Sequence, residues 1–508
     1  MDHLFITILL LLVSFLLATH FRGKYANLPP TIFPSIPIIG HLYLLKKPIY
    51  RTLAKLSAKH GPILFLHFGS RRVLVVSSPS VSEECFTKQN DIIFANRPHL
   101  LAGKILSSNY SSLGWAPYGD LWRNLRRIST IEVFSSIRLN EFHDVRANEG
   151  RLMIRKILSE CGSSPVNLNK VFQDLTSNVL MSMIARKRYF GSVDMEDEGK
   201  RFQEIVKESF LVAGASNIAD HLPILSWMGV KGFEKKLIAM QKNRSEFFQG
   251  LIDQLRKAEV GNNKEKKKNS SIIEVLLQLQ ETDPAYYTDE LIKSFILNLL
   301  AAGVDTSFTT MEWAFTLLLN HPHVLIKARN EIDNHVENHR LVNESDMANL
   351  PYLRCIINET LRLYPAAPLL VPHESSHDCV VGGYHVPRGT MLLINQWAIQ
   401  HDPDVWSDPE KFDPDRFKGF ESGRNGLKFM PFGSGRRSCP GEGLATRVIG
   451  LTLGLLIQCF DWERISEEMV DMSEGPGLSM PKVQPLFAKC KPLPITRNLV
   501  YETFESMT

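Results

Sequence analysis

The stretch PFGSGRRSCPG, from Pro431 to Gly441, decides how the rest of the chain is interpreted. It contains one cysteine, Cys439, just ahead of a segment, Gly443 to Ala445, where we predict that a helix begins. Free backbone N–H groups and the helix dipole favour a thiolate over a thiol at such a position, and a thiolate binds metals. A single cysteine is more often a small buried apolar residue than a ligand, so its neighbours must decide between the two.

Those neighbours fit a flat, acidic ligand. Gly433, Gly435 and Gly441 allow tight bends and a close approach of the backbone. Arg436 and Arg437 can pair with carboxylates. Haem has both a flat face and carboxylates, so the stretch predicts a haem site in which the cysteine is the metal ligand.

Composition limits the classes of protein that remain. The chain has 508 residues, 44% of them hydrophobic and 22% charged, so a large core is possible and wholesale disorder is excluded. The net charge is only +4, and the tract Lys264 to Lys268 lies among Asn and Ser as a solvated loop would, so no nucleic-acid partner is expected. The seven cysteines form no C-x-x-C pair, which argues against zinc and iron–sulfur sites and for a reducing compartment.

The N-terminus is predicted to lie in a membrane. LFITILLLLVSFLLA, from Leu4 to Ala18, continues to Phe21 and as a helix is long enough to cross a thin bilayer. No Lys or Arg precedes it, no small-x-small cleavage site follows it, and Arg22 and Lys24 lie just after it. These features favour an uncleaved anchor with a cytosolic body over a signal peptide.

Prolines mark the boundary behind this anchor. Pro29, Pro30, Pro34 and Pro37 exclude helix and favour a stiff, extended connector. The expected organisation is an anchor at residues 1–21, a basic and Pro-rich hinge at 22–42, and a haem-thiolate catalytic domain at 43–508.

The catalytic domain is predicted to be mostly α with small β-sheets. Ile63–Phe68 and Arg72–Val76 are short apolar strands that a hairpin turn connects. From about residue 80 to residue 350 the hydrophobic period is helical. Thr390–Ile394 is a further strand, and residues 401–435 form a long irregular stretch.

One long helix, expected from about Thr288 to His321, carries a candidate proton relay. Gly303 weakens the helix, and Thr306 can bond back to a carbonyl one turn earlier, so we expect a local bulge that admits water. Asp305 beside Thr306 places an acid next to a hydroxyl in an otherwise apolar helix. The alternative is a kinked core helix with an ordinary hydroxyl pair.

Two charged patterns carry a weaker signal. Glu359 and Arg362 lie three residues apart on one helix face, where an exposed pair contributes little, but apolar neighbours suggest burial and a third partner, Arg416. Trp122 and Arg126 project together, so they can grip one carboxylate with an N–H and a cation. An amphipathic helix with a core Trp is the alternative for the second pattern.

Together and in this order, the motifs resemble the cytochrome P450 superfamily over essentially the whole chain. The haem-loop pattern F-x-x-G-x-R-x-C-x-G is matched at Phe432, Gly435, Arg437, Cys439 and Gly441. The pattern E-x-x-R is matched at Glu359 and Arg362, W-x-x-x-R at Trp122 and Arg126, and A/G-G-x-D/E-T-T/S at Ala302, Gly303, Asp305, Thr306 and Ser307.

The resemblance implies the P450 fold, haem b, and a role for each matched residue. Cys439 would be the axial thiolate, with Phe432 packed over the sulfur. Trp122, Arg126 and Arg437 would bind the haem propionates. Asp305 and Thr306 would deliver protons during dioxygen activation. Glu359, Arg362 and Arg416 would form a structural triad, in which Asp415 stands where Glu is commoner before the last arginine.

The N-terminal LPP and PIIGHLYLL segments are similar to those of A-type plant enzymes of the endoplasmic reticulum. That group includes isoflavone and flavonoid hydroxylases, lignan methylenedioxy-bridge synthases and xanthone-forming oxidases, with some relatives acting on diterpenoids. A flat aromatic or terpenoid substrate is therefore expected. The expected pocket residues are Leu299, Ala302, Leu369, Leu370 and Leu478.

No G-x-G-x-x-G follows a strand and no P-loop is present, so electrons must come from another protein. The resemblance implies NADPH–cytochrome P450 reductase on the cysteine side of the haem, with cytochrome b5 as a further donor. It also implies O2 as co-substrate, contact with membrane lipid, and a single-pass protein of the endoplasmic reticulum with its catalytic domain in the cytosol.

Three other functions are weighed against a monooxygenase. An oxidase that couples phenols or closes a ring without inserting oxygen shares every motif. A haem sensor or carrier, and an isomerase that rearranges peroxides, have no need of a proton relay. The presence of Asp305 and Thr306 disfavours both, and the retained Thr306 favours hydroxylation over bridge formation.

Overall fold

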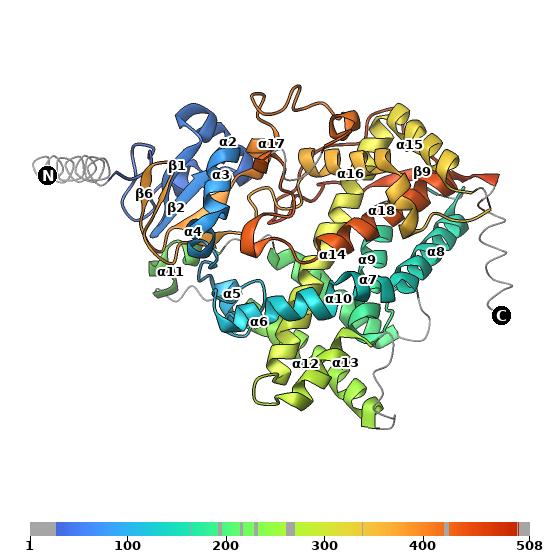
Figure 1. Cartoon of the computed structure of the whole chain (residues 1–508), viewed down its shortest axis with the longest axis horizontal. Helices are drawn as coiled ribbons and strands as arrows, with labels where there is room; N and C mark the ends of the chain where they lie inside the picture. The colour runs from blue at the N-terminus through green and yellow to red at the C-terminus, as the bar shows by residue number, and fades with distance from the viewer. Residues whose placement is uncertain are drawn as a thin grey trace, which may run out of the picture.

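The computed structural model describes residues 27–162, 164–191, 196–213, 217–227, 232–260, 270–337, 339–420, 426–494 and 496 (Figure 1). The predicted anchor at residues 1–21 lies outside the described residues. As predicted, helices dominate the chain, and the strands form small sheets.

The largest sheet has four strands in the order β1-β2-β7-β4. Strands β1 (Ile63–Phe68) and β2 (Arg71–Val76) form the predicted hairpin, with Phe68 opposite Arg71 across a two-residue turn. Strand β7 (Met391–Ile394) pairs with β2 in parallel and with β4 (His373–Glu374) antiparallel. A late segment thus completes a sheet that an early hairpin begins (Figure 1).

The described part of the predicted hinge, residues 27–42, lies against this sheet. Phe65 donates its backbone N–H to the Pro30 carbonyl at 2.7 Å, and His41 donates to the His67 carbonyl at 2.6 Å. Ile32 is buried with the strand residues. Residues 27–42 are therefore part of the body.

The other strands lie in two smaller sheets. They are β3 (Val166–Asn167), β9 (Phe487–Pro492) and β8 (Phe460–Glu463) in one, and β5 (Cys379–Val381) with β6 (Tyr384–Val386) in the other.

Helices make up the rest of the body (Figure 1). The early ones are α2 (Ile49–His60), α3 (Pro79–Phe86), α4 (Lys88–Ile93), α5 (Leu101–Leu106), α6 (Asp120–Ile128), α7 (Ser136–Glu141), α8 (His143–Glu160) and α9 (Leu168–Ala185). The middle ones are α10 (Glu196–Ala213), α11 (Pro223–Trp227), α12 (Gly232–Val260) and α13 (Ile272–Thr282). The late ones are α14 (Asp289–Asn320), α15 (Pro322–His335), α16 (Pro351–Leu363), α17 (Gln396–Gln400) and α18 (Glu442–Cys459).

Helix α14 runs through the middle of the molecule and packs against α9, α16 and α18 (Figure 1). Its ends agree with the prediction, because Thr288 caps the first turn by accepting a hydrogen bond from the Leu291 N–H. The helix stays α-helical from Ala302 to Ser307, so the predicted bulge is absent. Leu180 fills the space beside Gly303, where an added Cβ would lie 2.8 Å from its side chain.

Helices α14 and α18 are long and apolar enough to cross a membrane by composition. Most of the apolar window of each is buried inside the body, 61% and 72% respectively. Burial in the core accounts for their apolar character.

Candidate active site

The loop before α18 has the bent shape that its glycines predicted. Gly433 and Gly435 have φ angles of +71° and +70°, which favour glycine. A Cβ on Gly435 would lie 2.3 Å from Asp91 Oδ1, so a larger residue there would displace the Asp91 side chain. Gly441 differs, because its φ of −90° is open to any residue. Gly441 lies in a turn as predicted, but the turn does not require glycine at this position.

Cys439 lies just ahead of α18, as predicted. Its backbone N–H donates to the Phe432 carbonyl at 2.8 Å, and its sulfur accepts from the N–H groups of Gly441 and Glu442. Burial raises the pKa of the Cys439 thiol, while these N–H groups and Arg126 lower it. Protein surrounds the side chain, yet its surface is accessible, so Cys439 faces an interior space.

The middle of α14 faces an interior space in the same way. Ala301 and Ala302 are exposed and Thr306 is partly exposed, although most of the helix is buried. Thr306 donates its hydroxyl to the Ala302 carbonyl at 2.7 Å, as predicted. Burial raises the pKa of the Asp305 carboxyl. An acid that can hold a proton thus lies next to a hydroxyl.

Three arginines gather beside the cysteine loop. Arg437 donates to the Ala95 carbonyl at 2.6 Å and lies over the Trp122 ring, 4.6 Å from its centroid. Arg126 donates to the Ser438 carbonyl at 2.6 Å. Arg97 is fully enclosed and donates to the Val371 and Pro372 carbonyls. Trp122 and Arg126 therefore both reach the loop, but Arg437 is the cation at the indole.

This arginine cluster (Arg97, Arg126 and Arg437) carries unbalanced positive charge. Burial and the two other arginines lower the pKa of Arg437 to about 8, and burial lowers that of Arg97 to about 9. Burial also holds the pKa of His373 well below its usual value, with Arg97 and Arg437 adding to the effect. Among the described residues, no carboxylate contributes to these three shifts.

The cluster fits a group that carries carboxylates. Guanidinium groups stay charged in proteins, so an anion is the expected partner of a buried arginine cluster. The indole N–H of Trp122 is buried without a hydrogen-bond partner, which leaves a donor for the same anion. Haem propionates supply such carboxylates, and the cysteine loop lies next to the cluster.

Sequence reasoning missed Arg97 and His373. Arg97 stands before Pro98, and His373 follows Pro372, in segments with no helical or strand period. Only the fold brings the two side chains together, since β4 carries His373 into the sheet beside the Arg97 segment, where His373 lies 2.7 Å from the Phe94 carbonyl. The one available signal was a basic side chain next to a proline in a segment of apolar character.

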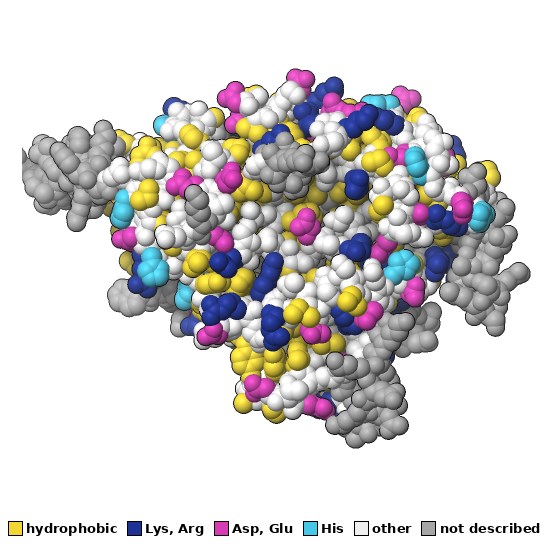
Figure 2. All heavy atoms as spheres, viewed as in Figure 1, with side chains coloured by type: hydrophobic (Ala, Val, Ile, Leu, Met, Phe, Trp, Pro, Cys, Tyr) yellow, Lys and Arg dark blue, Asp and Glu magenta, His cyan; other side chains and the backbone are white. Residues whose placement is uncertain are grey.

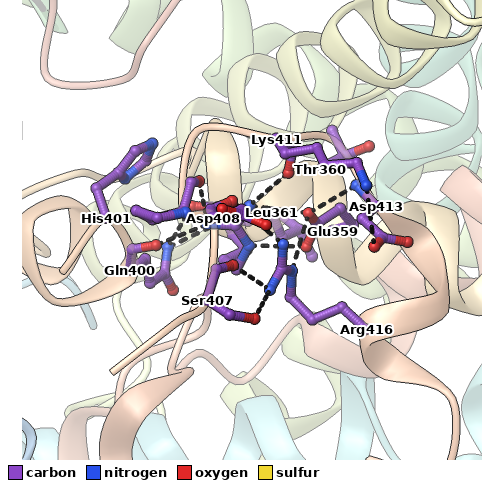
Figure 3. A network of polar contacts seen from close by, with 12 residues as sticks. Glu359, Thr360, Leu361, Gln400, His401, Ser407, Asp408, Lys411, Asp413 and Arg416 are labelled. Carbon is purple, nitrogen blue, oxygen red and sulfur yellow. Dashed lines mark hydrogen bonds and ion pairs between the residues drawn. The ribbon is translucent and has the colours of Figure 1, made fainter. Parts of the chain in front are cut away.

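The predicted triad of Glu359, Arg362 and Arg416 is assembled (Figure 3). Arg362 donates to both oxygens of Glu359 at 2.7 and 2.8 Å, and both side chains are fully buried. Arg416 approaches Glu359 from the segment Pro414–Phe417, with its Nε 3.3 Å from Oε1. Each charge in the triad thus has a partner.

The triad also fixes the irregular stretch that follows α17. Arg362 donates to the carbonyls of Gln400 and Pro409 at 2.7 Å, and Glu359 accepts from the Asp413 N–H at 3.0 Å. The adjacent Asp415 turns outward and pairs with Lys327 at 2.7 Å. Asp415, which is shorter than the Glu commoner at this position, therefore forms an ion pair at the surface.

The predicted pocket residues are found in different surroundings. Leu299 and Leu370 are buried in the core, Leu370 with the residues of the sheet. Leu369 packs against a small cluster that contains Met480. Leu478 is 48% exposed, and the nearby Met480 carbonyl accepts a hydrogen bond from Trp313 of α14 at 2.6 Å. The structure thus brings the turn of Leu478 to α14.

Residues 30–487 match the family described as Cytochrome P450. The chain belongs to the cytochrome P450 family. Two solved zebra fish P450 structures, with abiraterone and with progesterone, superpose with TM-scores of 0.76 and 0.75. They cover 88% of this chain and all of theirs, at 24% and 25% identity, and show that the fold is that of P450 enzymes.

Curated plant P450s are similar over nearly the full length. Cytochrome P450 81Q32 of Catharanthus roseus is 49% identical, covering 98% of each chain. An isoflavone 3'-hydroxylase of Medicago truncatula is 48% identical, covering 94% of this chain and 95% of its own. A (+)-piperitol/(+)-sesamin synthase of Sesamum radiatum is 47% identical, covering 94% and 93%.

This P450 is therefore a haem-thiolate monooxygenase. It uses O2 and electrons derived from NADPH, receives those electrons from a redox partner, and acts on a small organic substrate. The predicted family, fold class, enzyme class and cofactor are confirmed.

Proposed function

We propose that this P450 hydroxylates a flat phenolic plant metabolite, such as an isoflavone, flavonoid or benzophenone. The observation that carries the proposal is the pair Asp305 and Thr306 on α14, next to the exposed Ala302 at an interior space. Relatives of nearly half identity that are named isoflavone hydroxylases support the substrate class. A diterpenoid is the other substrate to test.

Cys439 is the proposed axial ligand of the haem iron. The haem, when bound, supplies the iron that activates dioxygen, and a thiolate ligand favours O–O cleavage. The N–H groups of Gly441 and Glu442 hold the sulfur and favour its thiolate form. Phe432, whose carbonyl binds the Cys439 N–H, would shield the sulfur.

The proposed propionate site comprises the arginine cluster, His373 and Trp122. The unbalanced positive charge of the arginine cluster would attract the propionate carboxylates. The indole N–H of Trp122, which has no hydrogen-bond partner, would orient one of them. Arg437 is held by the carbonyls of Ala95, Leu113 and Ala116, so its position is set before any ligand binds.

Asp305 and Thr306 are the proposed proton relay. Burial raises the pKa of Asp305, which favours the protonated carboxyl that would give its proton to the Thr306 hydroxyl oxygen as Thr306 passes its own proton on. Thr306 donates its own proton to the Ala302 carbonyl at rest, so it must turn toward the interior space to pass a proton on.

Electrons are proposed to enter on the basic face of the molecule, from NADPH–cytochrome P450 reductase or cytochrome b5. Figure 2 shows Lys and Arg side chains across the middle of the face in view. Arg123 and Arg436, both exposed, lie over the Tyr118 ring, and Arg436 is close to Cys439 in the chain. An acidic partner fits this surface.

We also propose that the protein lies at the endoplasmic reticulum membrane, with an anchor at residues 1–21 and a hinge at residues 22–42.

A coupling or bridge-forming oxidase is the second candidate, because one relative is named a piperitol and sesamin synthase. Product mass separates the two. Membranes containing the enzyme and a plant reductase are given NADPH and flavonoids, benzophenones, lignans or diterpenoids. A gain of one oxygen atom supports the hydroxylase, whereas a loss of two hydrogens supports the oxidase.

Two variants test the assigned residues in the same assay. Cys439→Ser should abolish the thiolate-type carbon monoxide spectrum, and a retained spectrum would remove Cys439 from its role. Thr306→Ala should keep that spectrum but divert NADPH from product to hydrogen peroxide. Unchanged coupling in this variant would contradict the relay.

A further inference from the structure

A cavity of about 330 Å³ lies where α8, α18 and the loop before Glu344 meet. Among the described residues, none that is assigned to the haem, the proton relay or the substrate pocket lines it. The lining residues are His143, Ala147 and Arg151 of α8, Leu451 and Leu455 of α18, and His339, Arg340, Leu341, Val342 and Asn343 of the loop. The cavity is therefore separate from the site described above.

Each of the two helices presents one face to this cavity. The three lining residues of α8 follow one another at intervals of four positions, which places them in one row along the helix. Leu451 and Leu455 are spaced in the same way on α18 and are almost fully buried. A Cβ on Gly150 of α8 would lie 2.7 Å from the Leu455 side chain, so the helices are in close contact here. The two leucines thus form an apolar floor that is fixed in place.

The wall that the loop provides is fixed as well. The Val342 N–H donates to Gln458 Oε1 at 2.9 Å, and Gln458 Nε2 donates to the Arg340 carbonyl at 3.0 Å. The Arg340 guanidinium donates to both oxygens of Asp346 at 2.7 and 2.8 Å. The cavity is therefore formed before any ligand binds, and binding to a preformed cavity avoids the entropy cost of ordering it.

The side chains around the apolar floor are basic. Arg151 has no hydrogen-bond or ion-pair partner among the described residues. His143 lies 3.2 Å from Asp144, and His339 lies 3.3 Å from Glu337. Neither of these carboxylates lines the cavity, and no other described carboxylate does so. The Arg151 cation is therefore available to an anion that enters the cavity.

We propose that this cavity binds a small organic carboxylate with an apolar body, such as an aromatic acid of one or two rings. The Arg151 guanidinium would hold the carboxylate, because arginine matches a carboxylate with two parallel hydrogen bonds. The leucine floor would cover the apolar body and remove it from water. The cavity lies at the lower end of the range of about 300–1,000 Å³ that is usual for ligand sites, which favours a ligand of this small size.

The test is a calorimetric titration of the full-length, haem-loaded enzyme with cinnamate. Cinnamamide has the same shape without the charge, and inorganic phosphate has charge without an apolar surface, so these two are the comparison ligands. The haem absorption spectrum is recorded in the same titration to detect binding next to the iron.

Three variants locate the site. Arg151→Met removes the cation and keeps an apolar side chain, whereas Ala147→Trp fills the cavity from the same face of α8. Arg155→Met is the matched control, because Arg155 lies one turn further along α8 but does not line the cavity.

We expect one cinnamate to bind per chain without a change in the haem spectrum. Arg151→Met should weaken this binding about tenfold or more, since charge-assisted hydrogen bonds are lost. Ala147→Trp should abolish the binding, and Arg155→Met should leave it unchanged. Cinnamamide and phosphate should each bind more weakly than cinnamate, also by about tenfold or more, because each lacks one of the two interactions.

Several results would overturn the proposal. These are an unchanged affinity in Arg151→Met, equal affinities for cinnamate and cinnamamide, and phosphate that binds as tightly as cinnamate. Arg151→Met changes a partly exposed side chain with no described partner to lose, so it decides the question even if Ala147→Trp does not fold. Arg151→Lys, which keeps the charge without the planar fork, should recover part of the affinity.

Discussion

Two groups of buried arginines in this molecule differ in what balances their charge. In the triad, Arg362 meets Glu359 at 2.7 Å, and neighbouring carbonyls accept its remaining N–H groups. In the arginine cluster, Arg97 and Arg437 donate to carbonyls, and Arg437 also lies over the Trp122 ring, but no described carboxylate contributes to the pKa shift of either. The charges of the triad are balanced within the chain, whereas those of the arginine cluster are balanced only when an anion binds.

The difference separates a structural charge from a binding charge. A buried pair contributes to one fold because removing either partner leaves the other uncompensated. A buried cluster of like charge instead lowers the stability of the chain and returns that cost when a carboxylate binds. Burial alone therefore does not say which role an arginine has; its partners do.

The largest effect is expected from breaking the triad. Arg362→Met leaves Glu359 buried without its main partner, which should cost about 3–5 kcal/mol in the free energy of unfolding. Thermal unfolding and the yield of protein with a carbon monoxide spectrum measure this. The double variant Glu359→Leu/Arg362→Met should recover part of the loss, and a single variant that unfolds like the parent would contradict the triad.

A different signature is expected from Arg437→Met. The haem should be lost about 10–100-fold faster, because the anion loses one of its cations. The fold itself should change less than in Arg362→Met, since no carboxylate is left unpaired. Transfer of haem to apomyoglobin gives the rate, and Arg436→Met, which changes an exposed neighbour, is the control. Equal rates in both variants would argue against a propionate site.

A smaller effect is expected in how the stability of the protein near the triad depends on acid pH. Burial lowers the pKa of His401, which follows the Gln400 whose carbonyl Arg362 binds, to about 3. The unfolded chain takes up this proton near pH 6.5, so stability falls as the pH falls from about 6.5 toward 3. His401→Gln should flatten the decline of the melting temperature in that window, and an unchanged slope would show that His401 is not buried and neutral.

The smallest effect is expected at the edge of the triad. Lys327 and Asp415 form an exposed pair, with about half of each side chain accessible. Such pairs contribute about 0–1 kcal/mol, so Lys327→Met should shift the melting temperature little. A loss comparable to that of Arg362→Met would mean that Asp415 belongs to the buried network after all.

Elements with a strong hydrophobic period were predicted well. The hairpin of β1 and β2 and the ends of α14 agree with the sequence within one or two residues. The triad was also predictable, since Glu359 and Arg362 share a helix face among apolar neighbours. Local spacing and burial pattern suffice for such features.

Features made by distant segments were not predictable. Arg97 and His373 each stand alone in a segment without period, and each acquires its partners only when the chain folds. The bulge predicted in α14 is absent, and Leu180 of another helix packs against the regular helix at Gly303. The cysteine loop requires glycine at Gly433 and Gly435, where φ is positive, but not at Gly441.

The bond between Arg51 and Glu474 has a practical consequence. It joins the first long helix of the body to the turn that carries Leu478, and the Met480 carbonyl of that turn accepts a hydrogen bond from Trp313 of α14. A variant shortened at its N-terminus must therefore keep α2. Cutting past Ile49 would leave the Glu474 carboxylate without Tyr50 and Arg51 and release this turn from the body.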